Sequence, residues 1–176
     1  MTRKEFRKLI KHELYGDKKI SALNKIRIKY FQPNTNCMYL ARKMWFYHNE
    51  KKFKLLAKLL YKKIFRKYGC CIYPSAIVGK GFFIAHPVAI TIGRCVIGDN
   101  FAIYQNCIIG ARHVGDERKG NYPIIGNNVR LFSGSSILGA VSICDNVTIG
   151  AHSLVIKNIN QPGIYVGCPV KWIKEI

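Results

Sequence analysis

The sequence predicts a mainly β fold, a parallel β-helix built of hexapeptide repeats, which follows an α-helical N-terminal segment. Three observations predict it. Aliphatic residues recur every six positions after Gly69, and Gly, Asn and Asp recur between them at positions suited to turns. Before Gly69 the apolar residues instead follow helical spacing among many lysines and arginines. A chain of 176 residues with 49% apolar content is long enough for one such core.

The charge distribution divides the chain at the same point. Residues 1–68 hold 20 Lys and Arg against 4 Asp and Glu, a net charge of +16, whereas residues 69–176 hold 9 against 5, a net charge of +4. We therefore expect two units. Residues 1–69 form the basic α-helical N-terminal segment, and residues 70–176 form the β-helix with a loop at 111–123 and a C-terminal tail.

The helical segment contains four helical patterns. Thr2 and Glu5 form a capping box for a first helix that ends at Gly16, and further helices are expected around 20–30 and 37–48. Residues 51–68 place apolar side chains along one face and lysines near the opposite one, and Gly69 is a suitable stop.

After Gly69 the spacing is six. The aliphatic positions fall into three series, which are Ile72, Val78, Ile84 and Ile90; Ile97, Ile103 and Ile109; and Ile125, Leu131, Ile137, Ile143, Ile149 and Val155. Each hexad is expected to form one short strand and one turn, so that three hexads complete a triangular coil with the aliphatic residue pointing inward. The step from Ile90 to Ile97 is one residue too long, and residues 111–123 leave the coil as a loop, where functional groups are often found.

The seven cysteines match no zinc-ligand spacing, so we expect small buried apolar residues in a reducing compartment and no metal. The N-terminus lacks a secretory signal, and no apolar run is long enough to span a membrane, which predicts a cytoplasmic protein. No nucleic acid partner is expected, because no reader motif accompanies the positive charge.

Several motifs resemble a known family. Residues 72–171, with GKGFFIAH at 79–86, IIGNNV at 124–129, VTIGAHSLVIKNI at 147–159 and GCPVKWIKEI at 167–176, resemble the hexapeptide-repeat acetyltransferases, most closely the serine acetyltransferase branch. The resemblance implies a left-handed β-helix, a homotrimer with active sites between neighbouring prisms, acetyl-CoA as co-substrate and a histidine as general base.

The resemblance also implies particular site residues. His86 matches the family's catalytic histidine, and His113 in the loop is the second candidate; each could instead be a structural or exposed histidine. The expected acetyl-CoA contacts are Ala111, Ser133, Gly134, Ala151, Lys157 and Lys171, where small residues admit the pantetheine arm and lysines meet the phosphates.

Departures from the serine acetyltransferase pattern guide the choice of acceptor. Two family aspartates are replaced by Cys71 and Ala85, and an Arg-His pair is replaced by Asn121 and Tyr122. A zwitterionic serine loses its charged partners in this comparison. We therefore expect a sugar hydroxyl, on a glycan precursor in surface polysaccharide synthesis, as the acceptor. The residues expected to hydrogen-bond it are Asp116, Glu117, Asn121 and Tyr122.

Two other functions stay open. One is serine O-acetyltransfer in cysteine biosynthesis, and the other is a non-catalytic, membrane-associated scaffold. The basic helix at 51–68 bears on the scaffold function. This helix either lies on the anionic inner face of the membrane, which would make the protein peripheral to that membrane, or packs its apolar face on the rest of the protein.

Overall fold

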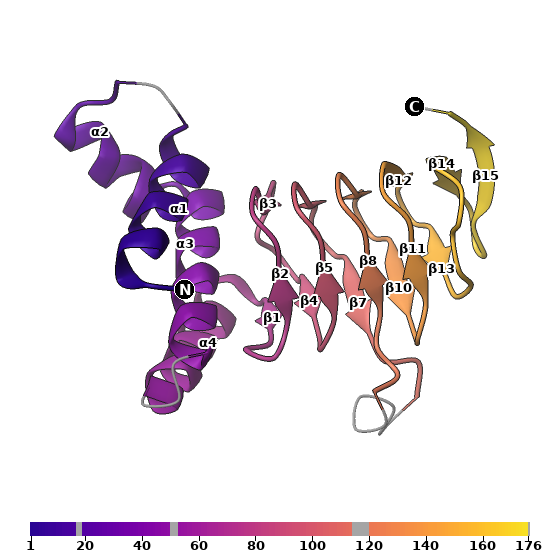
Figure 1. Cartoon of the computed structure of the whole chain (residues 1–176), viewed down its shortest axis with the longest axis horizontal. Helices are drawn as coiled ribbons and strands as arrows, with labels where there is room; N and C mark the ends of the chain where they lie inside the picture. The colour runs from indigo at the N-terminus through magenta and orange to yellow at the C-terminus, as the bar shows by residue number, and fades with distance from the viewer. Residues whose placement is uncertain (17–18, 50–52, 114–119, 176) are drawn as a thin grey trace.

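The computed structural model describes residues 1–16, 19–49, 53–113 and 120–175. The helices gather at one end of an elongated molecule, and the remainder of the chain winds away from them as a coil that ends at the C-terminus (Figure 1). This is a parallel β-helix of about five turns, so the predicted fold class is confirmed.

The helices are α1 (Arg3–Tyr15), α2 (Ala22–Ile26), a π-helix η1 (Arg27–Phe31), α3 (Pro33–Asn49) and α4 (Lys54–Tyr68). The capping box of Thr2 and Glu5 is present, as predicted, and α1 ends at Gly16. Helix α3 begins four residues earlier than predicted, because Pro33 occupies its first turn, where a missing N–H costs nothing. Gly69 ends α4 in the left-handed conformation, with φ of 63°.

The strands are short. They are β1 (Cys71–Ile72), β2 (Ile77–Val78), β3 (Phe83–Ile84), β4 (Thr91–Ile92), β5 (Val96–Ile97), β6 (Ala102–Ile103), β7 (Ile108–Gly110), β8 (Ile124–Ile125), β9 (Arg130–Leu131), β10 (Ser136–Leu138), β11 (Ser142–Ile143), β12 (Val147–Ile149), β13 (Leu154–Val155), β14 (Gly163–Val166) and β15 (Lys171–Lys174). Sheet A has the order β1-β4-β7-β10-β13, sheet B the order β2-β5-β8-β11, and sheet C the order β3-β6-β9-β12-β14-β15. All pairs are parallel except β14 with β15.

Inward-pointing aliphatic residues stack in one ladder per sheet. The ladders are Ile72-Ile92-Ile109-Ile137-Val155 in sheet A, Val78-Ile97-Ile125-Ile143-Ile159 in sheet B and Ile84-Ile103-Leu131-Ile149-Tyr165 in sheet C. Almost all of these side chains are buried, so burial of stacked apolar surface is what stabilises the coil.

Ile90 was assigned wrongly to the ladder. Its side chain is fully buried, but Ile92 takes the strand position that pairs with Ile72. Ile90 instead belongs to a second stack at the start of the sheet A strands, where Cys71 N donates to Ile90 O and Thr91 N donates to Cys107 O. Hexad counting could not separate the two, because both positions are apolar.

Cysteines occupy several such corner positions. Cys37, Cys70, Cys95 and Cys107 are buried, as predicted, whereas Cys71 and Cys144 are half-buried and Cys168 is exposed. For these last three, the expectation of a fully buried side chain is wrong.

The three edges of the prism differ in regularity. On the B/C edge, between sheets B and C, every step from one ladder residue to the next is six residues. The side chains of Asp99, Asn127 and Asp145 accept hydrogen bonds there from backbone N–H groups of the preceding coil, at 2.7–2.8 Å. This edge is therefore a continuous polar ladder with a structural role.

The other two edges carry all the irregular steps. On the C/A edge the step from Ile84 to Ile92 is eight residues, and on the A/B edge the step from Ile109 to Ile125 is sixteen. These two insertions contain the widened corner at His86 and the predicted loop.

The helical segment closes the first coil through a buried ion pair. Arg42 and Glu13 have side chains 6% and 2% exposed and lie 2.6 Å apart. Arg42 also donates to Val78 O at 2.8 Å, and Glu13 accepts from Gly81 N at 2.8 Å. The first coil thus has polar partners where a further coil would otherwise stack.

Helix α4 packs on the rest of the protein. Ala57, Leu60 and Ile64 are buried in the core shared with α3, which favours packing for this face over a membrane contact. The charged residues Lys51 and Lys52 at the start of the predicted 51–68 helix lie outside the described residues. Among the helices that the structure describes, none is long and apolar enough to cross a membrane.

Candidate active site

His86 lies on the widened corner of the C/A edge, directly after β3. Ala85 N donates to Ile103 O at 3.0 Å, so the chain keeps coil register up to this point. It then turns sharply, with Val88 N donating to His86 O at 2.9 Å and Ala89 at φ of 49°. The two extra residues push the corner outward, and the His86 imidazole is exposed. An exposed imidazole on a stable coil is suited to proton transfer with a bound hydroxyl.

The residues in register with His86 on later coils form a row. Two positions beyond the ladder residues Ile84, Ile103, Leu131 and Ile149 stand His86, Gln105, Ser133 and Ala151. His152 N donates to Ser133 O, and Gly134 N donates to Gln105 O, which ties these corners together. The structure therefore places His86 on the same edge as three of the residues predicted to contact acetyl-CoA, which are Ser133, Gly134 and Ala151.

Aromatic rings flank this row. The His86 and Tyr104 rings lie 6.5 Å apart at 59°, and Tyr104 stacks on Phe132 at 4.7 Å and 12°. Both Tyr104 and Phe132 stand one position after a ladder residue, which is the signal in the sequence that could have found them. They form an apolar surface that leads from the imidazole along the coils.

Two polar groups on this edge stand out. The Gln105 Oε1 atom is shielded from solvent and has no hydrogen-bond partner among the described residues. The Cys107 thiol is fully buried and donates to Phe132 O at 3.0 Å. Burial raises the pKa of Cys107, so the thiol stays protonated and is a poor nucleophile. Of these groups, the exposed imidazole is the one suited to proton transfer.

Gly134 and His152 meet in the middle of the row. Gly134 has φ of 71°, and a Cβ atom there would lie 2.6 Å from His152 Nδ1. A side chain at position 134 is therefore both strained and blocked. The His152 ring fills the space beside Gly134.

The predicted loop residues lie on a different edge. Ala111 and exposed His113 follow β7, and Asn121 and Tyr122 precede β8, so all four lie on the A/B edge. The Arg94 guanidinium, from the same edge one coil earlier, lies 4.8 Å from the centre of the Tyr122 ring. Sequence reasoning missed Arg94. Asp116 and Glu117 lie outside the described residues.

The two predicted phosphate-binding lysines are also separated. Lys157 is exposed on the A/B edge after β13, and Lys171 is exposed at the start of β15, where its backbone pairs with Val166. Within one chain the site residues thus form two groups, one with His86 on the C/A edge and one with the loop on the A/B edge. A site that uses both groups needs two prisms side by side.

Comparisons with known proteins agree with this architecture. Residues 122–157 match the model of the bacterial transferase hexapeptide family (six repeats). A serine acetyltransferase of Staphylococcus aureus strain Mu50 is 38% identical over 130 residues, which are 73% of this chain and 59% of the relative. The chain therefore spans about three fifths of that relative's length.

Solved structures show the same fold. A crystal structure of Neisseria gonorrhoeae serine acetyltransferase superposes with a TM-score of 0.81 at 24% identity, covering 99% of this chain and 68% of that one. A serine acetyltransferase in complex with CoA superposes with a TM-score of 0.78 at 18% identity, covering 97% of this chain and 71% of that one.

These findings correct the predicted acceptor. Sugar O-acetylation in surface polysaccharide synthesis is contradicted, since the matched relatives are serine acetyltransferases. The findings instead favour serine O-acetyltransfer, which the sequence had left open as an alternative. The physical reason is that charges were counted only at the family's motif positions, where Asn121 and Tyr122 carry none. The fold brings the guanidinium of Arg94 onto Tyr122 from another coil. The comparisons confirm that the chain resembles the hexapeptide-repeat acetyltransferases and, among them, the serine acetyltransferase branch.

Proposed function

We propose that this protein transfers the acetyl group of acetyl-CoA to the hydroxyl of serine, with His86 as the general base. The observation that carries the proposal is the position of His86. It stands exposed on the single lengthened corner of the C/A edge, in register with the small residues Ser133 and Ala151 and beside Tyr104. The similarity to serine acetyltransferases supports the choice of acceptor.

The reaction is a direct acyl transfer. A neutral His86 imidazole accepts the proton of the serine hydroxyl while the hydroxyl oxygen attacks the thioester carbonyl carbon. The C–O bond forms, the C–S bond breaks, and the imidazolium returns its proton to the leaving thiolate. The oxyanion of the tetrahedral intermediate needs hydrogen-bond donors, and backbone N–H groups at the prism corners are of the right kind.

Acetyl-CoA would lie along the row of coils. Gly134 and Ala151 leave room for the pantetheine arm on the C/A edge, with Ser133 as a polar partner. Ala111 and Lys157 would approach from the A/B edge of a neighbouring prism, and Lys171 from the C-terminal strand. A structural neighbour described as a complex with CoA supports this co-substrate.

The same separation of residues supports the proposed homotrimer. His86 and the 111–123 loop lie on different edges of one prism, so we propose that each active site forms where the C/A edge of one copy faces the A/B edge of the next. In this arrangement His113 is a loop residue near the acceptor and a second candidate for the base. The cytoplasmic location stays a prediction.

Arg94 is proposed to bind the carboxylate of serine. A guanidinium pairs with a carboxylate in a planar, bidentate manner. The Tyr122 ring, whose centre lies 4.8 Å from the Arg94 guanidinium, helps to hold this group in place. Asn121 and Tyr122 add neutral hydrogen bonds. Asp116 and Glu117 are proposed to face the ammonium group, as carboxylates of the same loop.

The base is tested with His86→Asn, measured by thiol release from acetyl-CoA with L-serine. We expect kcat to fall about 10²–10⁴-fold, with the oligomer unchanged in size-exclusion chromatography. His113→Asn is the matched control and should keep most of its activity. Full activity in His86→Asn together with loss in His113→Asn would transfer the role of base to the loop.

The acceptor site is tested with Arg94→Gln. The KM for serine should rise at least about tenfold, with the KM for acetyl-CoA unchanged, and Arg94→Lys should restore part of the affinity. An equal change in both KM values would mean that Arg94 only supports the fold. If the wild-type protein neither binds CoA in calorimetry nor releases thiol with serine, the non-catalytic scaffold is the better assignment.

A further inference from the structure

The helical stretch formed by α2 and η1 buries none of its side chains. It runs from Ala22 to Phe31 and includes Leu23, Ile26, Tyr30 and Phe31, which are 81%, 50%, 49% and 76% exposed. An isolated helix of this length is marginal in water and usually depends on packing of an apolar face. The Tyr30 ring meets the Tyr39 ring of α3 edge to face, with ring centres 6.2 Å apart. Leu23, Ile26 and Phe31 leave half or more of their surface to solvent.

The stretch is nevertheless held in place by its polar groups. Ser21 caps α2 by accepting from Asn24 N at 3.3 Å. At the other end, Asn36 of α3 donates to Lys29 O at 2.8 Å, and the Lys29 ammonium lies 4.1 Å from the centre of the Tyr39 ring. These contacts fix the backbone and leave the apolar side chains outward. In Figure 1, α2 lies at the end of the molecule remote from the coil.

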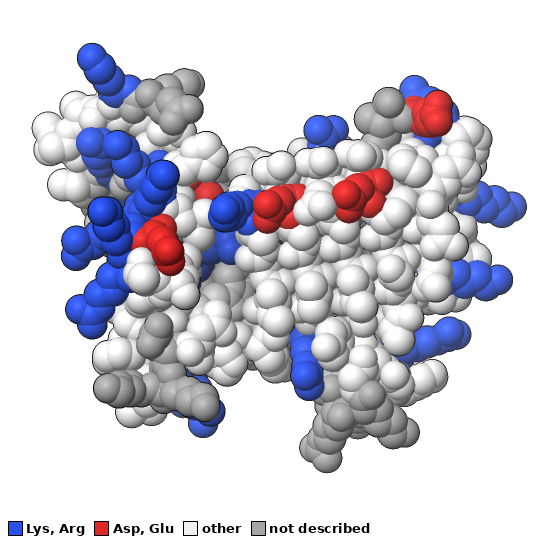
Figure 2. Space-filling model, viewed as in Figure 1, with Lys and Arg blue, Asp and Glu red and all other residues white. Residues whose placement is uncertain are grey.

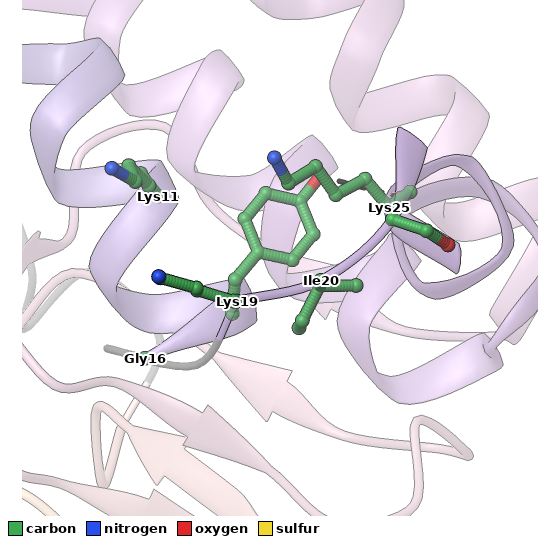
Figure 3. Close-up of a pocket in the computed structure, with 7 residues that line it drawn as sticks. Lys11, Gly16, Lys19, Ile20 and Lys25 are labelled. Atoms are coloured by element: carbon green, nitrogen blue, oxygen red, sulfur yellow. Dashed lines mark hydrogen bonds between the residues drawn. The ribbon is translucent and has the colours of Figure 1, made fainter. Parts of the chain in front are cut away.

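Positive charge surrounds these exposed apolar residues. Residues 19–49 contain six Lys and Arg and no Asp or Glu. Lys11, Lys19 and Lys25 line a hollow of about 550 Å³ beside α2 (Figure 3). Tyr15 also lines this hollow, and its hydroxyl donates to Lys25 O. In the view of Figure 2, Lys and Arg side chains are concentrated over the helical segment and are sparser over the coil.

We propose that the α2–η1 surface, defined as Leu23, Ile26, Phe31, Lys19, Lys25 and Arg27, binds the headgroup region of an anionic lipid bilayer. Exposed apolar side chains among lysines on one short helix are suited to shallow insertion, with the ammonium groups held at the lipid phosphates. The surface differs from α4, whose apolar side Ala57, Leu60 and Ile64 is buried against α3. The coil, with its active-site edges, would then project from the membrane.

Charge selects this occupant over a second copy of the chain. Residues 19–49 hold six Lys and Arg and no Asp or Glu, so two copies of this surface placed face to face repel each other at physiological salt. An anionic bilayer offers both the apolar boundary for Leu23 and Phe31 and the negative charge for the lysines. An acidic protein supplies the charge alone and offers no apolar boundary.

The test is flotation of the full-length protein with vesicles of phosphatidylglycerol and phosphatidylcholine, and with phosphatidylcholine alone. We expect flotation with the anionic vesicles only, weakening as salt is raised. Leu23→Ser/Phe31→Ser should weaken the partition coefficient roughly hundredfold, and Lys19→Gln/Lys25→Gln roughly tenfold. All four side chains are exposed or line the surface hollow, so folding is expected to be kept, as circular dichroism will check.

The matched control is Leu55→Ser/Leu59→Ser, which removes two exposed leucines, 73% and 53% exposed, from the basic helix α4. It should float like the wild type. The proposal is overturned if anionic vesicles do not float the protein, or if Leu23→Ser/Phe31→Ser floats unchanged. Equal loss in the α4 control also overturns it, and so does self-association through Leu23 and Phe31 in sedimentation without lipid.

Discussion

Glu13→Gln is expected to destabilise the protein by about 3–5 kcal/mol, the range for breaking a buried ion pair by removing one partner. The wild-type carboxylate accepts from Arg42 Nη2 at 2.6 Å, from Arg42 Nε at 2.8 Å and from the backbone N–H groups of Gly81 and Phe82 at 2.8 and 3.2 Å. In Glu13→Gln the side-chain amide has only one oxygen for these four donors, and its own N–H₂ group faces some of them. Arg42, 6% exposed, keeps its charge without a counterion.

For a domain of this size each kcal/mol corresponds to about 2–4 °C in Tm, so the melting temperature should fall by about 6–20 °C. Urea denaturation followed by tryptophan fluorescence is a suitable assay. Trp45 reports on this junction, because its indole N–H donates to Tyr73 O at 3.0 Å and its ring lies 5.5 Å from the Arg42 guanidinium.

Glu5→Gln is the matched control. It makes the same exchange on the same helix at an exposed capping position and should cost less than about 1 kcal/mol. Glu13→Leu/Arg42→Met, which removes both charges, should recover most of the loss, since an apolar pair can replace a buried ion pair. A loss below about 1 kcal/mol in Glu13→Gln would refute the idea that this ion pair closes the coil.

Three further predictions concern the coil. Ile103→Ala, in the middle of the sheet C ladder, should cost about 2–5 kcal/mol in urea denaturation, because the stacked neighbours cannot collapse into the cavity. The Asn127 backbone N–H holds the pKa of Asp145 below its usual value. Asp145 therefore stabilises the fold at pH values above its unfolded-state pKa, and this contribution is lost as pH falls through the lowered pKa. The stability of Asp145→Asn should differ most from that of the wild type near neutral pH and not at all in strong acid. Burial raises the pKa of Cys95 to about 12, so iodoacetamide at neutral pH should label exposed Cys168 and leave Cys95 unmodified, as peptide mass mapping will show.

The fold was predictable because its signal is repeated. Each ladder position recurs once per coil, so a single misassigned residue such as Ile90 leaves the overall period intact. The helix ends at Gly16 and Gly69 were predictable for a similar reason, since a glycine at a helix C-terminus has a local backbone cause. Tyr165, by contrast, ends the sheet C ladder with an aromatic residue and lay outside the aliphatic series.

The site was predictable in part. The motif ending at His86 pointed to an imidazole that is exposed, and the small residues Ser133 and Ala151 lie in register with it on the same edge. The acceptor prediction was wrong, because contacts between coils are not visible in linear spacing. Arg94 and Tyr122 are 28 positions apart in the chain, yet the Arg94 guanidinium meets the Tyr122 ring because both residues precede strands of sheet B.

The two ends of the prism are sealed in different ways. At the first coil the Glu13 carboxylate occupies the backbone N–H groups of Gly81 and Phe82, and at the last coil β15 reverses direction and runs antiparallel to β14. A parallel stack of coils is in principle an open template onto which a further molecule can add end to end. With both ends of the template blocked, end-to-end addition of further copies into growing fibres is disfavoured.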